Sequence, residues 1–142
     1  MKIRLVLLGK TRRAECRVLI DDYAARIRHY SELEIDEVRE ESAALKKLTF
    51  PPSATVVLLD AAGKTFTTES FAAWLRKQRE TVSRELIFLC GGAAGFPPNV
   101  SHHATMKLSL SSLTIPHEFA RVVLAEQIYR AFTILAGHPY SK

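Results

Sequence analysis

The chain has 142 residues, which is the size of one ordinary domain with a full hydrophobic core. Hydrophobic residues make up 47% of it and charged residues 25%, values typical of a globular protein, and no apolar run is long enough to cross a bilayer. Twenty Lys and Arg residues against fifteen Asp and Glu residues give a formal charge of +5. This charge is compatible with a nucleic-acid partner but does not by itself establish one.

The N-terminus and the cysteines indicate the compartment. The segment MKIRLVLLGK has a basic start, but its apolar run is very short and no small-residue cleavage site follows it, so we expect no signal peptide. Cys16 and Cys90 fall on a predicted helix and a predicted strand, which favours buried reduced thiols and a cytoplasmic protein. No cluster of Cys and His has the spacing of a metal site, so we expect no bound metal.

The hydrophobic pattern predicts five strands that alternate with helices. Short apolar runs, typical of strands in parallel sheets, cover residues 3–8, 55–60 and 86–90, and alternating segments at residues 33–38 and 105–110 predict two further strands. Amphipathic or capped segments predict helices over residues 12–30, 40–48, 67–81, 99–104 and 117–135, and the segments 61–64 and 91–98 are predicted loops. We therefore expect a single domain, residues 1–142, with an α/β fold built on a three-layer, mainly parallel sheet.

Two loops stand out because each directly follows a predicted strand. The carboxyl ends of parallel strands are where α/β sheets bind ligands. The first loop, GGAAG at residues 91–95, is not a dinucleotide fingerprint, and a tight turn alone explains its glycines equally well. The second, SSLTI at residues 111–115, has small hydroxyls and no charge. That suits an adenine or a thioether better than a bare phosphate, although a capped helix start is the plain alternative.

The last predicted helix is apolar around most of its circumference, which indicates a homodimer interface that includes Val122, Ile128 and Phe132. Gly137 is suited to end this helix, and Pro139 prevents its continuation. Polar residues on the helix and in the tail are candidates for chemistry. Glu126 and Arg130 are four residues apart and can pair, while His117, His138 and Tyr140 are candidates for acid–base roles, although most single histidines are structural.

These motifs together resemble those of the RlmH-type (YbeA-like) methyltransferases of the SPOUT class. GGAAG is followed by LSLSSLTIPH, RVVLAEQIYRAF and HPY, and the earlier segments KIRLVLLGK and LLDAAGK match in order and placement. The resemblance spans nearly the whole chain. It implies an S-adenosylmethionine-dependent enzyme that N3-methylates a pseudouridine in a stem-loop of 23S ribosomal RNA. It further implies a homodimer whose active sites are completed by the partner chain, and a C-terminal trefoil knot, which neither composition nor periodicity indicates.

The resemblance also assigns roles to individual residues. It implies cofactor contacts at the strand-end loops, namely at Leu59, Gly91, Leu110, Ser111, Ser112, Leu113, Thr114 and Ile115. For the reaction that the resemblance implies, Glu126, Arg130, His138 and Tyr140 are our candidates for orienting the target base, with the proton acceptor left open. Two departures accompany it: the stretch between Val38 and Pro51 is shorter than is usual in the family, and Ser141 stands where the family tail usually has a histidine.

Two other functions remain open at this point. A protein that keeps the fold and binds ribosomes without turnover would also fit the resemblance, because the tail histidine is missing. An α/β nucleotide-binding module unrelated to RNA is the second alternative. It is disfavoured because AAGK at residues 61–64 lacks the spacing of a phosphate-binding loop and because the loop at residues 111–115 carries no charge.

Overall fold

The computed structural model describes residues 1–40, 43–81 and 85–140. Within them, strands form one sheet in the order β2-β1-β4-β3-β5, and every neighbouring pair is parallel. The strands are β1 (Lys2–Leu8), β2 (Glu32–Val38), β3 (Thr55–Thr65), β4 (Glu85–Cys90) and β5 (Met106–Ser109). The helices are α1 (Ala14–Ile27), α2 (Ala43–Lys46), α3 (Thr68–Glu80), α4 (Pro98–Ser101) and α5 (His117–Ala136). The predicted parallel α/β sheet is confirmed.

The central strands are apolar because both of their faces are covered. Along β4, Leu86 and Phe88 belong to one hydrophobic cluster, whereas Ile87 and Leu89 belong to a second cluster on the opposite face. All four side chains are at most 1% exposed. Burial of alternate residues on opposite faces explains why the sequence shows a continuous apolar run and no alternation.

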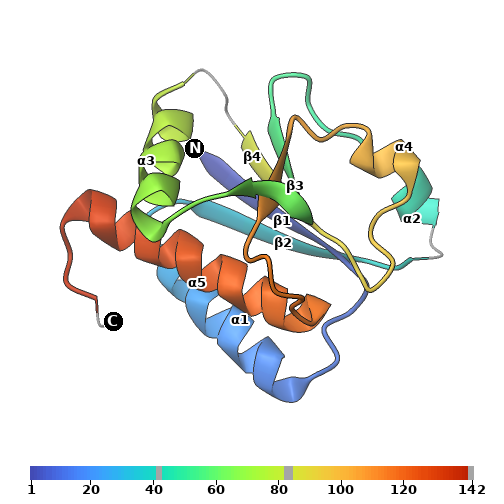
Figure 1. Ribbon diagram of the computed structural model, residues 1–142, viewed down its shortest axis with the longest axis horizontal. Helices are drawn as coiled ribbons and strands as arrows, with labels where there is room; N and C mark the ends of the chain where they lie inside the picture. The colour runs from blue at the N-terminus through green and yellow to red at the C-terminus, as the bar shows by residue number, and fades with distance from the viewer. Residues whose placement is uncertain (41–42, 82–84, 141–142) are drawn as a thin grey trace.

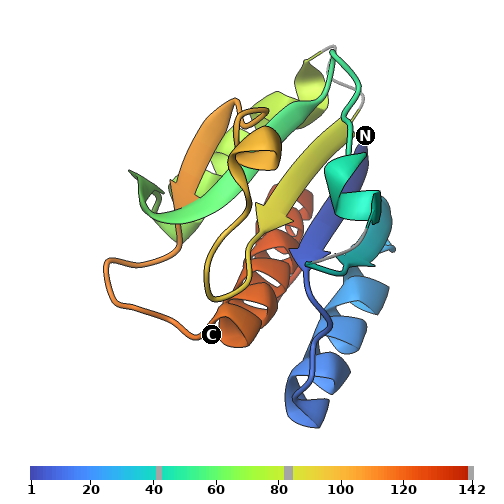
Figure 2. The ribbon, with the colours of Figure 1, turned by 90° about the vertical axis from the view of Figure 1, so that its right-hand side faces the viewer.

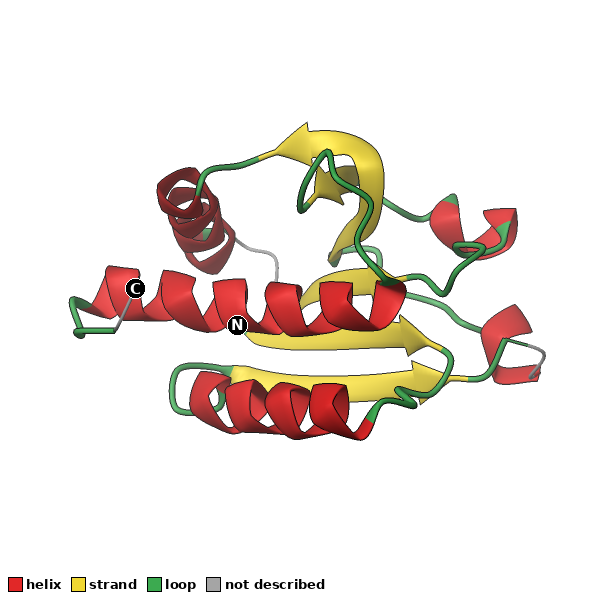
Figure 3. Ribbon diagram, turned by 60° about the horizontal axis from the view of Figure 1, so that its bottom comes forward, coloured by secondary structure: helices red, strands yellow, loops and turns green. Residues whose placement is uncertain are grey.

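The two faces of the sheet are covered unequally. The three long helices α1, α3 and α5 supply side chains to the first cluster, and α1 and α5 lie side by side over the sheet (Figure 1, Figure 3). The opposite face is covered by the one-turn helices α2 and α4 together with loop residues such as Phe50 and Phe96. Helices on both faces were predicted. One of the two outer layers, however, consists of one-turn helices and loops and contains no long amphipathic helix.

Helix α5 packs against both α1 and α3 as well as the sheet. Ile128 is fully buried and Phe132 is 1% exposed, so these two residues fill the core of their own chain. Their prediction as interface residues is wrong, since neighbouring helices cover a wider arc of α5 than a sheet alone would. The apolar residues of α5 that remain exposed are Phe119, Val123 and Ile134.

The end of α5 is fixed by its glycine. Gly137 adopts a left-handed conformation with φ +68°, and the N–H of His138 donates to the carbonyl of Thr133 at 2.9 Å. Glycine reaches this conformation without the steric penalty of a Cβ atom. The prediction that Gly137 ends the helix is confirmed, and residues 138–140 form a short tail that folds back along α5, where the Tyr140 hydroxyl donates to Glu126.

Two predicted segments differ from the structure. Residues 61–64 are not a loop: β3 continues to Thr65, with a register shift that pairs both Leu59 and Lys64 with Leu108. The extra residues form a bulge, which lets β3 bend around β5. The predicted helix over residues 40–48 is reduced to Ala43–Lys46, while positions 41 and 42 lie outside the described residues.

Other sequence expectations concern the membrane, the thiols and metals. In the described ranges, no helix is both long and apolar enough to span a membrane. Cys16 and Cys90 are free and buried. The described residues contain no group of three or more His, Cys, Asp and Glu side chains placed to hold a metal ion.

Gly63 allows the close contact between β3 and β5. A Cβ atom at this position would lie 2.6 Å from the carbonyl carbon of Lys107. We expect Gly63→Ala to lower the free energy of unfolding by about 1–3 kcal/mol, because backbone must move to relieve the overlap. Urea unfolding measures the change, with Ala62→Ser at the exposed neighbouring position as the control. Equal stability of the two variants would contradict the role of this contact.

Candidate functional site

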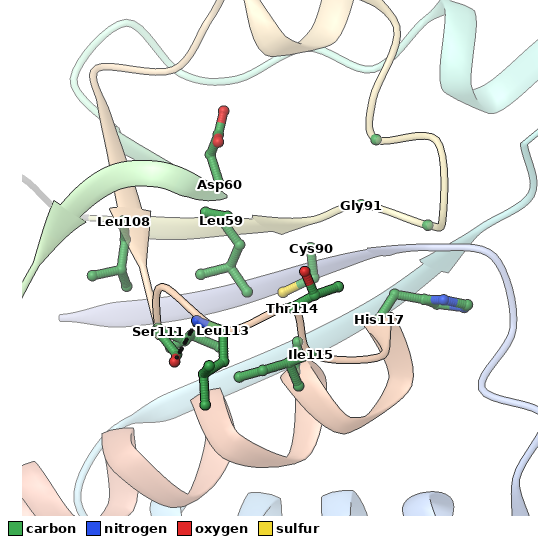
Figure 4. A pocket seen from close by; sticks show the side chains of 15 residues that line it. Leu59, Asp60, Cys90, Gly91, Leu108, Ser111, Leu113, Thr114, Ile115 and His117 are labelled. Atoms are coloured by element: carbon green, nitrogen blue, oxygen red, sulfur yellow. Dashed lines mark hydrogen bonds between the residues drawn. The ribbon is translucent and has the colours of Figure 1, made fainter.

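A pocket lies beside the carboxyl ends of β4 and β5 and the middle of β3. The loops that follow β4 and β5 meet there (Figure 2), and Leu59 to Ala61 of the intervening strand β3 contribute to the lining. The pocket has a volume of about 220 Å³ and is bounded on one side by the first turn of α5. Its walls are mostly aliphatic side chains and loop backbone (Figure 4).

Most of the predicted cofactor residues share this pocket. The lining includes Leu59, Gly91, Leu110, Ser111, Leu113, Thr114 and Ile115. Ser112 is exposed and is not part of the lining, so the structure separates it from the other predicted residues. The two strand-end loops chosen from the sequence are therefore brought together.

The hydroxyl groups of the second loop hold the loop itself in shape. Ser109 donates to the carbonyl of Ser111 at 3.0 Å, and the hydroxyl of Ser111 accepts the N–H of Leu113 at 3.0 Å (Figure 4). Such local bonds are typical of Ser in turns. A ligand in this pocket would therefore meet Leu110, Leu113 and backbone groups more than free hydroxyls.

The glycine loop is both a tight turn and a wall of the pocket. A Cβ atom on Gly91 would lie 2.9 Å from the Cα of Gly95, and Gly95 itself has φ +72°. Both positions therefore depend on glycine, one for close approach and one for conformation. The glycines therefore fit both explanations offered from the sequence, because the backbone that makes the tight turn also forms a wall of the pocket.

Several lining residues were not among the predicted cofactor contacts, namely Asp60, Cys90, Gly92, Gly95, Leu108 and His117. Asp60 is the carboxylate of the lining, and it accepts the N–H of Ala62 at 2.9 Å. His117 is the first residue of α5. A signal was available for most of them, because Asp60 ends the strand predicted over residues 55–60, Gly92 lies two residues after the end of β4, and His117 follows the proline that starts the last helix.

A buried guanidinium lies beneath the pocket. Arg121 is 1% exposed and donates to the hydroxyl of Thr11 at 2.8 Å and to the carbonyl of Leu8 at 2.7 Å. Burial lowers the pKa of Arg121, which is opposed by nearby acidic groups. Burial also raises the pKa of the Cys90 thiol to about 12, so Cys90 is a neutral wall residue at physiological pH and not a nucleophile.

The predicted base-orienting residues form a second cluster on α5 and the tail. The Glu126 carboxylate accepts Arg130 Nη2 at 2.8 Å and the Tyr140 hydroxyl at 2.9 Å, and it also accepts Gln127 Nε2 at 2.8 Å. The Arg130 guanidinium lies 4.5 Å from the centre of the Tyr140 ring. Glu126 thus fixes the relative positions of a cation and an aromatic ring.

The chemistry of this cluster follows from its bonds. Burial and hydrogen bonds with Tyr23 and Glu126 raise the pKa of Tyr140, so its hydroxyl stays protonated at neutral pH. The bond to Glu126 raises the pKa of Arg130, which therefore keeps its charge. His138 lies apart from the carboxylate: its Nδ1 atom is 2.6 Å from the Tyr30 hydroxyl.

The two clusters are separated along one helix. The pocket lies at the first turn of α5, whereas Arg130 is in its second half and His138 follows its end. Glu126 and Arg130 come nine and thirteen residues after His117 along α5, which is about 14 and 20 Å at 1.5 Å per residue. The pocket lining contains none of the predicted base-orienting residues, so a single chain does not bring them to the predicted cofactor residues.

Comparison of the sequence with known proteins identifies its relatives. A family model described as "Predicted SPOUT methyltransferase" matches residues 1–141. Ribosomal RNA large subunit methyltransferase H of Geobacter metallireducens is 43% identical over 152 residues, with 99% of this chain and 98% of that protein covered. The protein of the same name from Solibacter usitatus is also 43% identical, over 140 residues and 99% of each chain.

A solved structure supports the fold. It is described as a probable methylase family protein from Haemophilus influenzae Rd KW20, and it matches with a TM-score of 0.51 at 12% identity. The match covers 95% of this chain and 66% of that one. At this identity the likeness concerns the fold alone. The full-length sequence matches carry the assignment: the chain belongs to the SPOUT methyltransferase family, among the relatives named ribosomal RNA large subunit methyltransferase H.

Proposed function

We propose that this protein is a cytoplasmic, S-adenosylmethionine-dependent methyltransferase that acts as a homodimer on N3 of a pseudouridine in 23S ribosomal RNA. The observation that carries the proposal is the pocket between Leu59, Gly91 and the loop of residues 110–115, in a chain whose full-length relatives are named for methylation of large-subunit RNA. The formal charge of +5 also suits an RNA substrate.

In this proposal the pocket holds the cofactor. The aliphatic side chains of Leu59, Leu110 and Ile115 suit the adenine ring, and the loop backbone beside Gly91 suits its polar edges. Asp60 is at the rim, but its side chain points away from that of Leu59 (Figure 4) and its carboxylate pairs with Lys107 at 3.8 Å, so we assign it no contact with the cofactor. The bound cofactor supplies an activated methyl group, and the chain contributes binding, orientation and exclusion of water.

The tail cluster orients the acceptor base. Methyl transfer needs the nucleophile in line with the methyl group, so positioning is the largest contribution that the protein can make. Tyr140 offers a ring for stacking, and Arg130 offers a fixed positive charge for the developing charge on the base. Three donors already occupy Glu126, which we therefore assign to positioning Arg130 and Tyr140 and not to accepting the proton.

A dimer reconciles the two separated clusters. The tail of one chain would complete the pocket of its partner, with exposed apolar residues such as Phe119 and Val123 available for the interface. We include a C-terminal trefoil knot in the proposal. Its support is that the loops after β4 and β5 run together around one pocket, while α5 is packed between α1 and α3.

Transfer of labelled methyl groups to ribosomes that lack the modification tests the function. Mass mapping should place the new methyl group on one pseudouridine of 23S ribosomal RNA. If the protein binds ribosomes but is inactive on every pseudouridylated preparation, the non-catalytic alternative is favoured.

Gly91 separates cofactor binding from folding. We expect S-adenosylmethionine to raise the thermal midpoint of the wild-type protein, since saturation at 100-fold Kd stabilises the folded state by about 2.7 kcal/mol. Gly91→Ala should abolish this shift, because its Cβ would overlap the backbone of Gly95. Ala93→Ser is the matched control, since Ala93 is exposed in the same loop and is not part of the pocket lining. An unchanged shift in Gly91→Ala would argue against this site.

The tail should matter for transfer and not for cofactor binding. Deleting residues 139–142 is expected to leave the cofactor-induced thermal shift intact and to abolish methyl transfer. Tyr140→Ala should cause most of this loss, because a stacked base contact contributes about 1–3 kcal/mol. Ser141→Ala, which lies outside the described residues, is the control and should change little. Full activity of the truncated protein would exclude this role for the tail.

Mixed dimers test whether the active site is shared. Gly91→Ala and Arg130→Ala homodimers should both be inactive, for different reasons. Random pairing of the two chains makes half of the dimers mixed, each with one complete site, so co-refolding should restore about a quarter of wild-type activity. Light scattering should report twice the chain mass. Failure of the mixture to regain activity would mean that each chain acts alone.

A further inference from the structure

A short basic loop lies at the same edge of the sheet as the pocket. The segment KTRRAECR, residues 10–17, carries four Lys or Arg residues and one Glu, and it connects β1 to α1. Because it follows a strand, it leaves the sheet at the carboxyl edge. Most charge runs of this kind are simply solvated surface. A role in binding therefore has to be argued from where the loop lies relative to the pocket.

The backbone of this loop is held by buried and half-buried side chains. Arg121 binds the hydroxyl of Thr11, and Glu37 accepts the N–H of Thr11. Glu118 accepts the N–H groups of Arg12 and Arg13, at 3.0 Å and 2.9 Å. Side-chain hydrogen bonds rarely hold the backbone of a surface loop at so many points. A buried guanidinium often adds little to stability, so stability alone does not explain these bonds. The bonds fix the path of the backbone from the end of β1 to the start of α1.

Of the four basic side chains in this segment, Arg17 pairs with Glu37 at 3.7 Å, and the other three are not neutralised. Glu37 and Glu118 are engaged with backbone N–H groups of the loop. Lys10, Arg12 and Arg13 are exposed, and across residues 1–40, 43–81 and 85–140 none of them forms an ion pair. The Arg13 guanidinium lies 5.4 Å from the centre of the Phe119 ring. A rigid loop thus presents fixed positive charge.

The loop is adjacent to the pocket. Glu118, which binds the loop, directly follows His117, which lines the pocket. His117 lies on the side of the pocket where the chain passes from β1 to α1 (Figure 4). A polyanion whose reactive base enters the pocket would therefore pass close to Lys10 and Arg12.

We infer that the loop of residues 10–13 binds the phosphate backbone of the RNA beside the target nucleotide. The inference rests on the proposed function, because it takes RNA as the substrate. Charge complementarity identifies the occupant: phosphates are the groups that exposed Lys and Arg side chains contact in RNA complexes, and such contacts position without reading sequence. Arg121 and Glu118 act as positioning residues for this loop.

The test compares two double variants that each remove two charges. Lys10→Gln with Arg12→Gln alters the loop. Lys77→Gln with Arg79→Gln alters exposed residues in the last turn of α3, which leads into the amino end of β4 at the opposite edge of the sheet. Binding to ribosomes that lack the modification is measured over a range of salt concentrations, together with methyl transfer and the cofactor-induced thermal shift.

We expect the loop variant to bind ribosomes about three- to tenfold more weakly and to lower the slope of log K against log salt by about 1–2. KM for ribosomes should rise while kcat and the thermal shift stay near wild type. The α3 variant should behave as wild type.

Equal behaviour of the two variants would overturn the inference, and so would dissociation of the loop variant into monomers. If the wild-type protein binds ribosomes without transferring methyl groups, the proposed reaction is refuted. The difference in salt slope between the wild type and the loop variant still tests whether the loop binds phosphates. Absence of wild-type ribosome binding would overturn both.

Discussion

The buried guanidinium of Arg121 joins parts of the chain that are far apart in sequence. It bonds to the end of β1 and to the loop that follows, while its own helix, α5, is the last element of the fold. A buried charge must find partners, because an unpaired one is very costly in the low-dielectric interior. This requirement fixes the first turn of α5 against the carboxyl edge of the sheet. The wall of the pocket and the position of the basic loop both depend on that contact.

The length of α5 then determines how the site is assembled. Its first turn bounds the pocket, and its second half carries Arg130 and the tail that holds Tyr140. Because the helix is rigid, Glu126 and Arg130 stay about 14 and 20 Å along its axis from the first turn in one chain. The shared active site proposed above would bring these groups to a pocket without a change in the fold. It would also explain why a tail residue is fixed to its own helix through Glu126 and does not reach back to its own pocket.

Sequence reasoning succeeded where a residue pattern has one structural meaning. Leu86 to Cys90 had to be a doubly buried strand, and Gly91 after it had to turn, so the pocket edge followed. It failed where neighbours decide the outcome. Ile128 and Phe132 look interfacial on a helical wheel, but α1 and α3 cover them. Residues 61–64 look like a loop because Gly63 is a strand breaker, yet glycine is what allows β5 to approach. The buried role of Arg121 has no local signature, since only long-range partners make it possible.

In the proposed reaction, the tail cluster would contribute positioning in place of a missing acid–base group. Glu126 is saturated by three donors, and Tyr140 remains protonated because burial and its hydrogen bonds raise its pKa. Tyr140 therefore cannot act as the base, and the Glu126 oxygens are occupied by hydrogen-bond donors. What the cluster offers is a ring and a guanidinium in fixed relation, 4.5 Å apart, held by one carboxylate. An activated methyl donor needs an aligned nucleophile more than a strong base. A preorganised cation beside the base stabilises negative charge as it develops there, and this contribution does not depend on a histidine at position 141.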